Sequence, residues 1–270
     1  MNSDIRDYWE ERSRGARSDS RTTDDIYMRE LEVFECIDTL RRLGVIEGRV
    51  LDIGCGDGQS TVAIAEAIPT LRVDGIDFSE SMIEHASARA LQAQVQDRVS
   101  FSVADVTDLL PPVTGGPYRA ALSMRCLINL ESASDQQRAL ASVAGFIEPG
   151  GYYIAIENFI EGQIEMNNAR VAVGLPEIPV RWHNLFFTED LFLSWGREHF
   201  ETIDFTNFAS SYYFATRVIY SKMCAMRDEE PDYHHEIHQL AVHLPNIGNF
   251  SPIRKAVLRT HGSHSDPHPT

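Results

Sequence analysis

Residues 50–58 read VLDIGCGDG, and this stretch decides the fold. An apolar run leads into Gly54, Gly56 and Gly58, and the small, apolar residues 60–67 that follow are typical of a helix packed on a sheet. Glycine lets the backbone turn tightly and approach a ligand without contact from a Cβ atom. The stretch therefore predicts a strand, a ligand-binding turn and a helix in succession.

Short apolar runs alternate with helical patterns on both sides of this motif. Strands are predicted at residues 49–53, 71–76, 99–103, 118–123, 152–156, 201–208 and 211–220. Helices are predicted at residues 25–43, 60–67, 79–90, 135–146 and 188–195, and a short helix is predicted within residues 231–243. Strands that alternate with helices predict an α/β fold, in which a mostly parallel sheet carries helices on both faces.

These patterns divide the chain into a cap, a core and an extension. The predicted parts are an N-terminal helical cap at 1–46, an α/β core at 47–225, a C-terminal helical extension at 226–260 and a disordered tail at 261–270. Residues 158–187 interrupt the rhythm of the core after the fifth strand. Because segments of this length in compact domains are usually functional, we expect a substrate-binding insertion that closes over the site together with the N-terminal helix.

The charge of the chain argues against two classes of partner. The formal net charge is −16 and the sequence pI is about 5.0, without a dense run of lysine and arginine, so nucleic acid and an anionic membrane surface are disfavoured. Neither a long apolar run nor the apolar segment of a secretory signal occurs. The four cysteines are scattered without a CxxC pair, which favours a reducing cytoplasm.

The glycine spacing distinguishes this turn from a dinucleotide-binding turn. A dinucleotide turn reads GxGxxG and holds a pyrophosphate at a helix N-terminus. Here the third glycine comes one residue early, and Asp52 and Asp57 add negative charge, which suits a ligand with a cationic centre and no phosphate. Asp77 ends the second predicted strand, where a carboxylate can accept hydrogen bonds from two ribose hydroxyls. Asp105 ends the third and suits an adenine amino group, with Val106 against the ring.

Together these elements resemble the motifs of the class I, S-adenosylmethionine (SAM)-dependent methyltransferases. The resemblance extends from about Tyr8 to Tyr220: residues 52–58 are similar to the first motif, residues 76–86 to the second and residues 103–106 to the third. It implies a Rossmann-like, seven-stranded sheet with a reversed last strand, and SAM as the cofactor. The SAM-binding residues that it implies are Tyr8, Trp9, Arg12, Asp52, Gly54, Cys55, Gly56, Gly58, Asp77, Phe78, Met82, Asp105 and Val106.

Two further stretches carry the resemblance. Residues 8–12 are similar to the N-terminal lid helix that covers SAM in many members of the family. Residues 157–184 resemble a subgroup that modifies small polar metabolites and natural products. The acceptor is therefore predicted to be a small molecule.

Candidate acceptor-binding residues lie at strand ends and in the insertion. His183 is the first choice for a general base, with a structural histidine packed beside Trp182 as the alternative. Glu157 ends the fifth strand, either as an acceptor contact or as a cap. Arginines that could hold an anionic group of the acceptor, or instead be salt-bridged, are Arg170, Arg181 and Arg217. The remaining candidates are Arg125, Asn129, Asn184 and Tyr213.

The predicted reaction is methyl transfer from SAM to an oxygen of a small polar metabolite or natural product. Methylation of nitrogen and a SAM-binding module without turnover stay open, whereas the glycine spacing disfavours an NAD(P) dehydrogenase. No metal is predicted because this transfer needs none, although His234, His235 and His238 have a spacing that a metal site can use. The oligomeric state is open, with a homodimer as one option.

Overall fold

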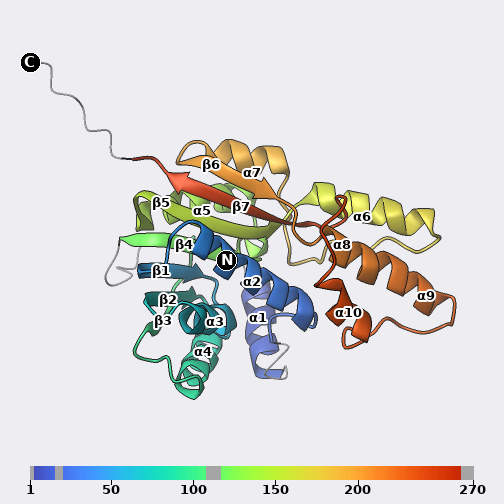
Figure 1. The fold of residues 1–270 in the computed structure, drawn as a ribbon, viewed down its shortest axis with the longest axis horizontal. Coiled ribbons are helices and arrows are strands. Elements are labelled where there is room, and N and C mark those ends of the chain that lie inside the picture. Colours follow the sequence, from blue (N-terminus) through green and yellow to red (C-terminus); the bar gives the residue numbers. More distant parts are fainter. Residues whose placement is uncertain (1–2, 16–20, 108–116, 263–270) are drawn as a thin grey trace, which may run out of the picture.

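The computed structural model describes residues 3–15, 21–107 and 117–262 and contains a seven-stranded sheet (Figure 1). The strands are β1 (Gly48–Ile53), β2 (Leu71–Asp77), β3 (Val99–Val103), β4 (Tyr118–Met124), β5 (Ile147–Asn158), β6 (Phe200–Thr206) and β7 (Ile253–Thr260). Their spatial order is β3-β2-β1-β4-β5-β7-β6. Strands β1 to β5 pair in parallel, whereas β7 runs antiparallel to both β5 and β6. The predicted mostly parallel sheet with a reversed last strand is confirmed.

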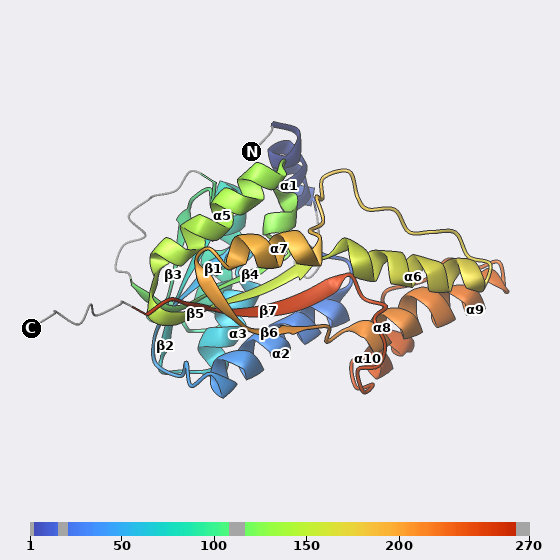
Figure 2. The ribbon, with the colours of Figure 1, turned by 90° about the horizontal axis from the view of Figure 1, so that it is seen from above.

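Helices cover both faces of this sheet (Figure 2). The helical segments are α1 (Ser3–Gly15), α2 (Ile26–Arg42), α3 (Gln59–Ala67), α4 (Glu80–Gln92), η1 (Leu127–Asn129), α5 (Ala133–Phe146), α6 (Ile160–Ala172), α7 (Glu189–Gly196), α8 (Ser210–Tyr213), η2 (Phe214–Tyr220), α9 (Ser221–Ala225) and α10 (Glu236–Ala241). One core joins α2, α3 and α4 to the sheet through Leu40, Ile64 and Ala90. A second core joins α5 and α7 through Leu140 and Phe192. Helices α6, α8, α9 and α10 form an arm beyond the end of the sheet (Figure 2).

The arm contains one segment that the sequence predicted wrongly. Residues 211–220, predicted as a strand, are helical, because α8 continues into the π-helix η2. The buried residues Tyr212, Thr216 and Tyr220 recur at every fourth position, as one face of a helix requires. The segment is rich in aromatic and β-branched residues, which favour strands, and periodicity does not separate the two structures in a short apolar run.

The last strand also differs from the prediction, because β7 forms inside the segment 226–260 that was expected to be helical. Within that segment the helix is α10, in the predicted position. β7 lies between β5 and β6 and is buried along almost its whole length. β7 contains charged residues, which are unusual in a buried strand, and two of them are neutralised by ion pairs. Arg254 pairs with Glu189 at 2.9 Å, and Lys255 pairs with Glu35 at 2.8 Å.

The predicted insertion begins with a helix rather than a loop. Asn158 ends β5 and α6 follows directly, so the non-helical part of the insertion is residues 173–187. This part returns to the sheet, where Phe187 forms an isolated bridge with Phe159 and Leu185 N–H donates to the Ile128 carbonyl at 2.6 Å. Most of the predicted tail at 261–270 lies outside the described residues.

Candidate active site

A cavity of about 280 Å³ lies at the carboxyl ends of the strands. One side is lined by residues that follow β1, β2 and β3, and the other by α2, α6, residues 178–186 and the π-helix η2. The strand order reverses direction between β1 and β4, next to this cavity. Open α/β sheets bind their ligands at such a switch point. The cavity is therefore the position at which this fold accepts a ligand.

The turn after β1 requires glycine at two positions. Gly54 has a φ of +69°, and a Cβ atom there would lie 2.3 Å from Cys126 Sγ. Gly58 has a φ of +76°, and its Cβ atom would lie 2.7 Å from Ala86 Cβ. An L-residue with a side chain rarely adopts such φ values. Since Gly54 and Gly56 line the cavity, the turn presents bare backbone to a ligand.

Asp77 ends β2 and lines the cavity beside this turn. Its Oδ2 accepts a hydrogen bond from Gly56 N–H and its Oδ1 accepts one from Ser79 N–H, both at 2.9 Å. These bonds fix the carboxylate and leave lone pairs on both oxygens. Burial raises the pKa of Asp77 to about 6, against the effect of the two backbone donors. The carboxylate is positioned to accept hydrogen bonds from ligand hydroxyls.

The two other carboxylates of the glycine motif serve the protein. Asp52 is buried outside the cavity lining, and its Oδ2 accepts from Ser60 Oγ at 2.7 Å, which fixes the start of α3. Asp57 pairs with Arg29 at 2.7 Å and with Arg89 at 2.6 Å. Burial alone would raise the pKa of Asp57, but the two guanidinium groups lower it. The negative charge of Asp57 is therefore compensated by two guanidinium groups.

The N-terminal helix and the insertion meet at the cavity. Tyr8 of α1 stacks on His183, with 4.3 Å between the ring centroids and 25° between the planes, and Trp9 contacts the same imidazole edge-on. Trp9 Nε1 donates to Asn129 Oδ1 at 3.3 Å, and Asn184 Nδ2 donates to the same oxygen at 3.0 Å. Asn129 thus ties both covering segments to the residues that follow β4.

His183 lines the cavity and is buried. Burial, with smaller effects from the charges of Arg181 and Arg12, lowers its pKa to about 4, so the ring is neutral near pH 7. Its Nδ1 is buried and has no hydrogen-bond partner in the described part of the chain. A neutral imidazole with a free ring nitrogen can accept a hydrogen bond from a ligand.

The last two residues of β5 point in opposite directions, as side chains on a strand do. Glu157 is fully buried and does not line the cavity. Its Oε1 accepts from Ser123 Oγ at 2.7 Å and from Leu127 N–H at 3.1 Å, so the predicted acceptor contact is instead a cap on η1. Burial raises the pKa of Glu157 to about 7. The neighbouring Asn158 lines the cavity, and strand alternation could have indicated it.

Two of the three arginines predicted to hold an anion are bound to other parts of the protein. Arg217 lines the cavity and forms an ion pair with Asp25. Arg170 is buried outside the cavity lining, where its guanidinium donates to the carbonyl oxygens of Pro176, at 2.8 Å, and of Arg217. Arg181 lines the cavity and is exposed.

Sequence reasoning missed the face of α2 that lines the cavity. This face presents Asp25, Met28, Arg29 and Glu32, and Glu32 forms an ion pair with Arg125 at 2.9 Å. Arg125 itself has a φ of +50°, a backbone conformation that is uncommon for residues other than glycine and recurs at functional sites. The signal for α2 was the spacing of its polar residues by three and four positions, which places them on one face of a helix.

The cavity collects most of the predicted site residues. Those that line it are Trp9, Gly54, Cys55, Gly56, Asp77, Phe78, Met82, Asp105, Val106, Arg125, Asn129, Arg181, His183, Asn184, Tyr213 and Arg217. Those that do not are Tyr8, Arg12, Asp52, Gly58, Glu157 and Arg170. Arg12 holds the segment that follows α1, because its Nε donates to the Arg21 carbonyl at 2.8 Å and its Nη2 pairs with Asp24 at 2.9 Å.

The histidines weighed for a metal site have another arrangement. Among the described residues, no group of three or more His, Cys, Asp or Glu side chains is placed to hold a metal ion. His238 Nδ1 instead lies 2.8 Å from Tyr212 Oη. No helix in residues 3–15, 21–107 and 117–262 has the length and apolar character needed to cross a membrane.

Comparison with known proteins supports the motif assignment. Residues 50–151 match a family model described as a methyltransferase domain. The 27-O-demethylrifamycin SV methyltransferase of Amycolatopsis mediterranei is 35% identical over 112 residues, which cover 42% of this chain and 39% of that protein. The O-methyltransferase rstn1 of Aspergillus nomiae is 28% identical over 173 residues, which cover 62% of this chain and 70% of that protein. The match therefore spans well under half of the first relative and about two thirds of the second.

A solved structure extends the similarity to the whole fold. The N-methyltransferase NodS from Bradyrhizobium japonicum WM9, in complex with S-adenosyl-L-homocysteine (SAH), matches with a TM-score of 0.58 at 14% identity, over 95% of this chain and 98% of that one. At this identity the likeness shows the fold alone. Residues 50–151 match a methyltransferase domain, and the whole chain shares the fold of this SAH-bound methyltransferase structure.

Proposed function

We propose that this protein transfers a methyl group from SAM to an oxygen atom of a small natural product or polar metabolite. The observation that carries the proposal is one cavity that joins the glycine turn and Asp77 to Asn158 and His183. The first pair offers bare backbone and a carboxylate for the methyl donor. The second pair offers neutral hydrogen-bond acceptors for the molecule that receives the methyl group. SAM, when bound, supplies a methyl group on a positively charged sulfur.

The residues present fit SAM in the cavity. Gly54 and Gly56 would hold its methionine end, because a Cβ atom at either position would collide with a neighbouring side chain. Asp77 would accept hydrogen bonds from the ribose hydroxyls. Asp105 would face the adenine amino group, with Val106 against the ring; both residues line the cavity. These assignments rest on the family motifs and on the position of each side chain at a strand end.

The protein contributes mainly alignment to this reaction. Holding two reactants in line can lower a barrier by about 7–11 kcal/mol. Tyr8, Trp9 and His183 pack together where the two covering segments meet, and this contact would exclude water from the acceptor. Because the pKa of His183 is lowered to about 4, we assign His183 to orienting the acceptor hydroxyl rather than to storing its proton. Glu157, the other predicted catalytic residue, is assigned a structural role.

The choice of oxygen is supported by two curated relatives whose names specify or include O-methylation, whereas NodS, an N-methyltransferase, shares the fold alone. The test has two steps. Calorimetry with SAH measures donor-site binding. Incubation with SAM and matched phenols, alcohols and amines, followed by mass spectrometry and NMR of the added methyl group, identifies the methylated atom.

Each outcome of this test has a defined meaning. We expect SAH binding and an O-methyl product. A product methylated only on nitrogen would move the assignment to N-methylation. SAH binding without product across the panel would favour a binding module without turnover. Absence of SAH binding by a folded protein would overturn the proposal.

A further inference from the structure

Most arginines of the cavity lining are paired with carboxylates. Three of its guanidinium groups are each paired with a carboxylate: Arg217 with Asp25, Arg125 with Glu32 at 2.9 Å, and Arg29 with Asp57 at 2.7 Å. The fourth arginine of the lining, Arg181, is exposed. An anionic group that displaced Asp25 from Arg217 would leave a buried carboxylate without its partner, which is strongly unfavourable.

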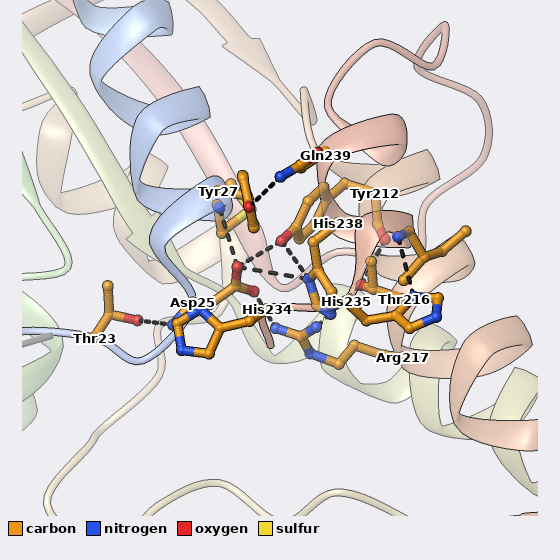
Figure 3. A network of polar contacts seen from close by, with 12 residues as sticks. Thr23, Asp25, Tyr27, Tyr212, Thr216, Arg217, His234, His235, His238 and Gln239 are labelled. Atoms are coloured by element: carbon orange, nitrogen blue, oxygen red, sulfur yellow. Dashed lines mark hydrogen bonds and ion pairs between the residues drawn. The ribbon is translucent and has the colours of Figure 1, made fainter. Parts of the chain in front are cut away.

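Further polar contacts hold the Asp25–Arg217 pair (Figure 3). Asp25 Oδ1 accepts hydrogen bonds from Met28 N–H, at 3.1 Å, and from the Tyr212 hydroxyl, while Asp25 Oδ2 binds Arg217. His238 Nδ1 lies 2.8 Å from the Tyr212 hydroxyl and 3.8 Å from Asp25 Oδ1. Burial lowers the pKa of His238 to about 4, so this histidine is neutral near pH 7. The network therefore carries only the opposite charges of Asp25 and Arg217.

Aromatic rings cover the guanidinium of Arg217. The centroid of Tyr213 lies 5.4 Å from its Cζ atom and that of Tyr233 lies 4.8 Å away, and both tyrosines line the cavity. Arg217 Nη1 donates to Thr216 Oγ1 at 3.0 Å. With two tyrosine rings against the guanidinium and both Nη atoms bonded, Arg217 is not presented for bidentate binding of a carboxylate through Nη1 and Nη2. The cavity lining beside it includes the apolar side chains of Met166 and Ile178.

Asn158, unlike Arg217, presents a polar atom without a partner: the oxygen of its side chain can accept a hydrogen bond but receives none within the described ranges. Asn158 lines the cavity at the end of β5 and is 7% exposed, and its Oδ1 is buried. Buried polar atoms in folded proteins are nearly always paired, so this oxygen points to a ligand that brings a donor.

We propose that the acceptor half of the cavity, defined by Asn158, Met166, Tyr213, Arg217 and Tyr233, takes an uncharged molecule with an aromatic or apolar body and a free hydroxyl group. Asn158 Oδ1 accepts the hydrogen bond of that hydroxyl. The Asp25–Arg217 pair rejects anionic molecules. This inference rests on the proposed function, because it assigns the substrate class of the same site, and it differs from the sequence expectation that arginines hold an anionic group.

Binding to the SAH-loaded protein tests the charge preference. The probes are methyl 4-hydroxybenzoate and 4-hydroxybenzoate, which share a phenol and differ in charge, followed by saturation-transfer NMR and competition. We expect the ester to bind at least about tenfold more tightly than the carboxylate. Asp25→Asn keeps the helix cap and the acceptor oxygen for Tyr212 but leaves Arg217 without its counter-charge, so it should shift the preference toward the carboxylate by about tenfold.

Asp38→Asn is the matched control for Asp25→Asn. Asp38 lies on the same helix, is 44% exposed and pairs with Arg42 outside the cavity, so the control removes the same charge and should leave the preference unchanged. A shift of equal size in Asp38→Asn would attribute the effect to net charge and overturn the role of the Asp25–Arg217 pair. SAH calorimetry on each variant verifies that the donor site is folded.

A third probe tests the hydroxyl contact. Methyl 4-methoxybenzoate lacks the phenolic donor, and wild type should bind it about tenfold more weakly than methyl 4-hydroxybenzoate. Asn158→Leu should remove that difference while SAH affinity is retained. A wild-type preference for the carboxylate, equal binding of phenol and ether, or no binding of any probe to SAH-loaded protein would each overturn the inference. Loss of SAH binding by wild type would instead overturn the proposed function.

Discussion

The indole N–H of Trp9 donates a hydrogen bond to Asn129 Oδ1 at 3.3 Å, across 120 positions of the chain. The same oxygen accepts from Asn184, so one side chain secures both segments that cover the cavity. Asn129 is itself fixed by bonds from its Nδ2 to the carbonyls of Arg125, at 2.8 Å, and Cys126, at 3.3 Å. Both segments that cover the cavity are therefore bonded to a residue of η1, which follows β4.

Replacing Asn129 should loosen this closure. Asn129→Leu removes the acceptor for both donors, and loss of a hydrogen bond of this kind costs about 0.5–1.5 kcal/mol. We expect SAH to bind about tenfold more weakly and limited proteolysis to cut faster within residues 173–187, which contain Asn184. Trp9→Phe should show a smaller effect in the same direction. Trp195→Phe, a substitution on α7 outside the cavity lining, is the matched control and should leave both measurements unchanged.

Asp77→Ala should weaken SAH binding by about 1–3 kcal/mol, because a charged acceptor for ligand hydroxyls is lost. Part of this loss of affinity will arise because the glycine turn is held less firmly, since Asp77 also accepts hydrogen bonds from Gly56 N–H and Ser79 N–H. Asp77→Asn retains one acceptor oxygen and should lie between wild type and Asp77→Ala. Calorimetry gives the three values, and equal affinity for all three proteins would contradict the ribose assignment.

The pH dependence of SAH binding offers an independent test of Asp77. Burial raises its pKa to about 6, so its carboxylate is ionised above that pH and protonated below it. The ionised form is the better hydrogen-bond acceptor. SAH affinity should therefore be flat from about pH 8 to 7 and fall below about pH 6, with a limit of about tenfold per pH unit. Asp77→Asn does not titrate and should lack this decline.

The cofactor half was predictable from sequence because local rules apply to it. Glycines at alternate positions after an apolar strand determine a turn, and a carboxylate at the next strand end must face the same edge of the sheet. Gly54, Gly56, Asp77 and Asp105 were found in this way, and all four line the cavity. The acceptor half depends on contacts between distant segments, which spacing along the chain does not encode.

Two errors show what pattern reading lacked. Glu157 was predicted as an acceptor contact or a cap, and Asn158, which faces the opposite side of the strand and lines the cavity, was not considered. β7 was read as part of a helical extension because Arg254 and Lys255 resemble surface residues, and their partners Glu189 and Glu35 lie far away in the sequence. A buried charge is recognisable only once its counter-charge is placed beside it.

Glu157 should make the wild-type protein less stable as the pH rises. Burial raises its pKa from 4.5 to about 7, so the folded state binds the proton more tightly than the unfolded state. The stability from this proton is complete below about pH 4.5 and is lost as the pH rises through 7, with a slope of at most about 1.4 kcal/mol per pH unit. Glu157→Gln lacks the titrating group, and its stability relative to wild type should increase from pH 5 to pH 8.

Thermal unfolding of both proteins across this range provides the measurement. Asp77 is present in both proteins and contributes equally to the pH dependence of their stability. The difference in stability between the two proteins therefore reports the contribution of Glu157. Glu148→Gln, on the same strand but partly exposed, is the control and should run parallel to wild type. A difference between wild type and Glu157→Gln that stays constant with pH would contradict the buried-proton explanation.

Variants of His183 can distinguish a role in orienting the acceptor from a role as a general base. His183→Phe keeps a ring against Tyr8 but removes the free Nδ1, so the turnover number should fall by about tenfold, as expected for one lost orienting hydrogen bond, while SAH affinity stays within about twofold. His183→Asn places an amide oxygen near the former Nδ1 and should recover part of the rate. Because burial lowers the pKa of His183 to about 4, wild-type kcat should show no histidine-like inflection between pH 6 and 8. An inflection there that disappears in His183→Asn would identify His183 as a general base after all, and the control His199→Phe, outside the cavity lining, should retain the wild-type profile.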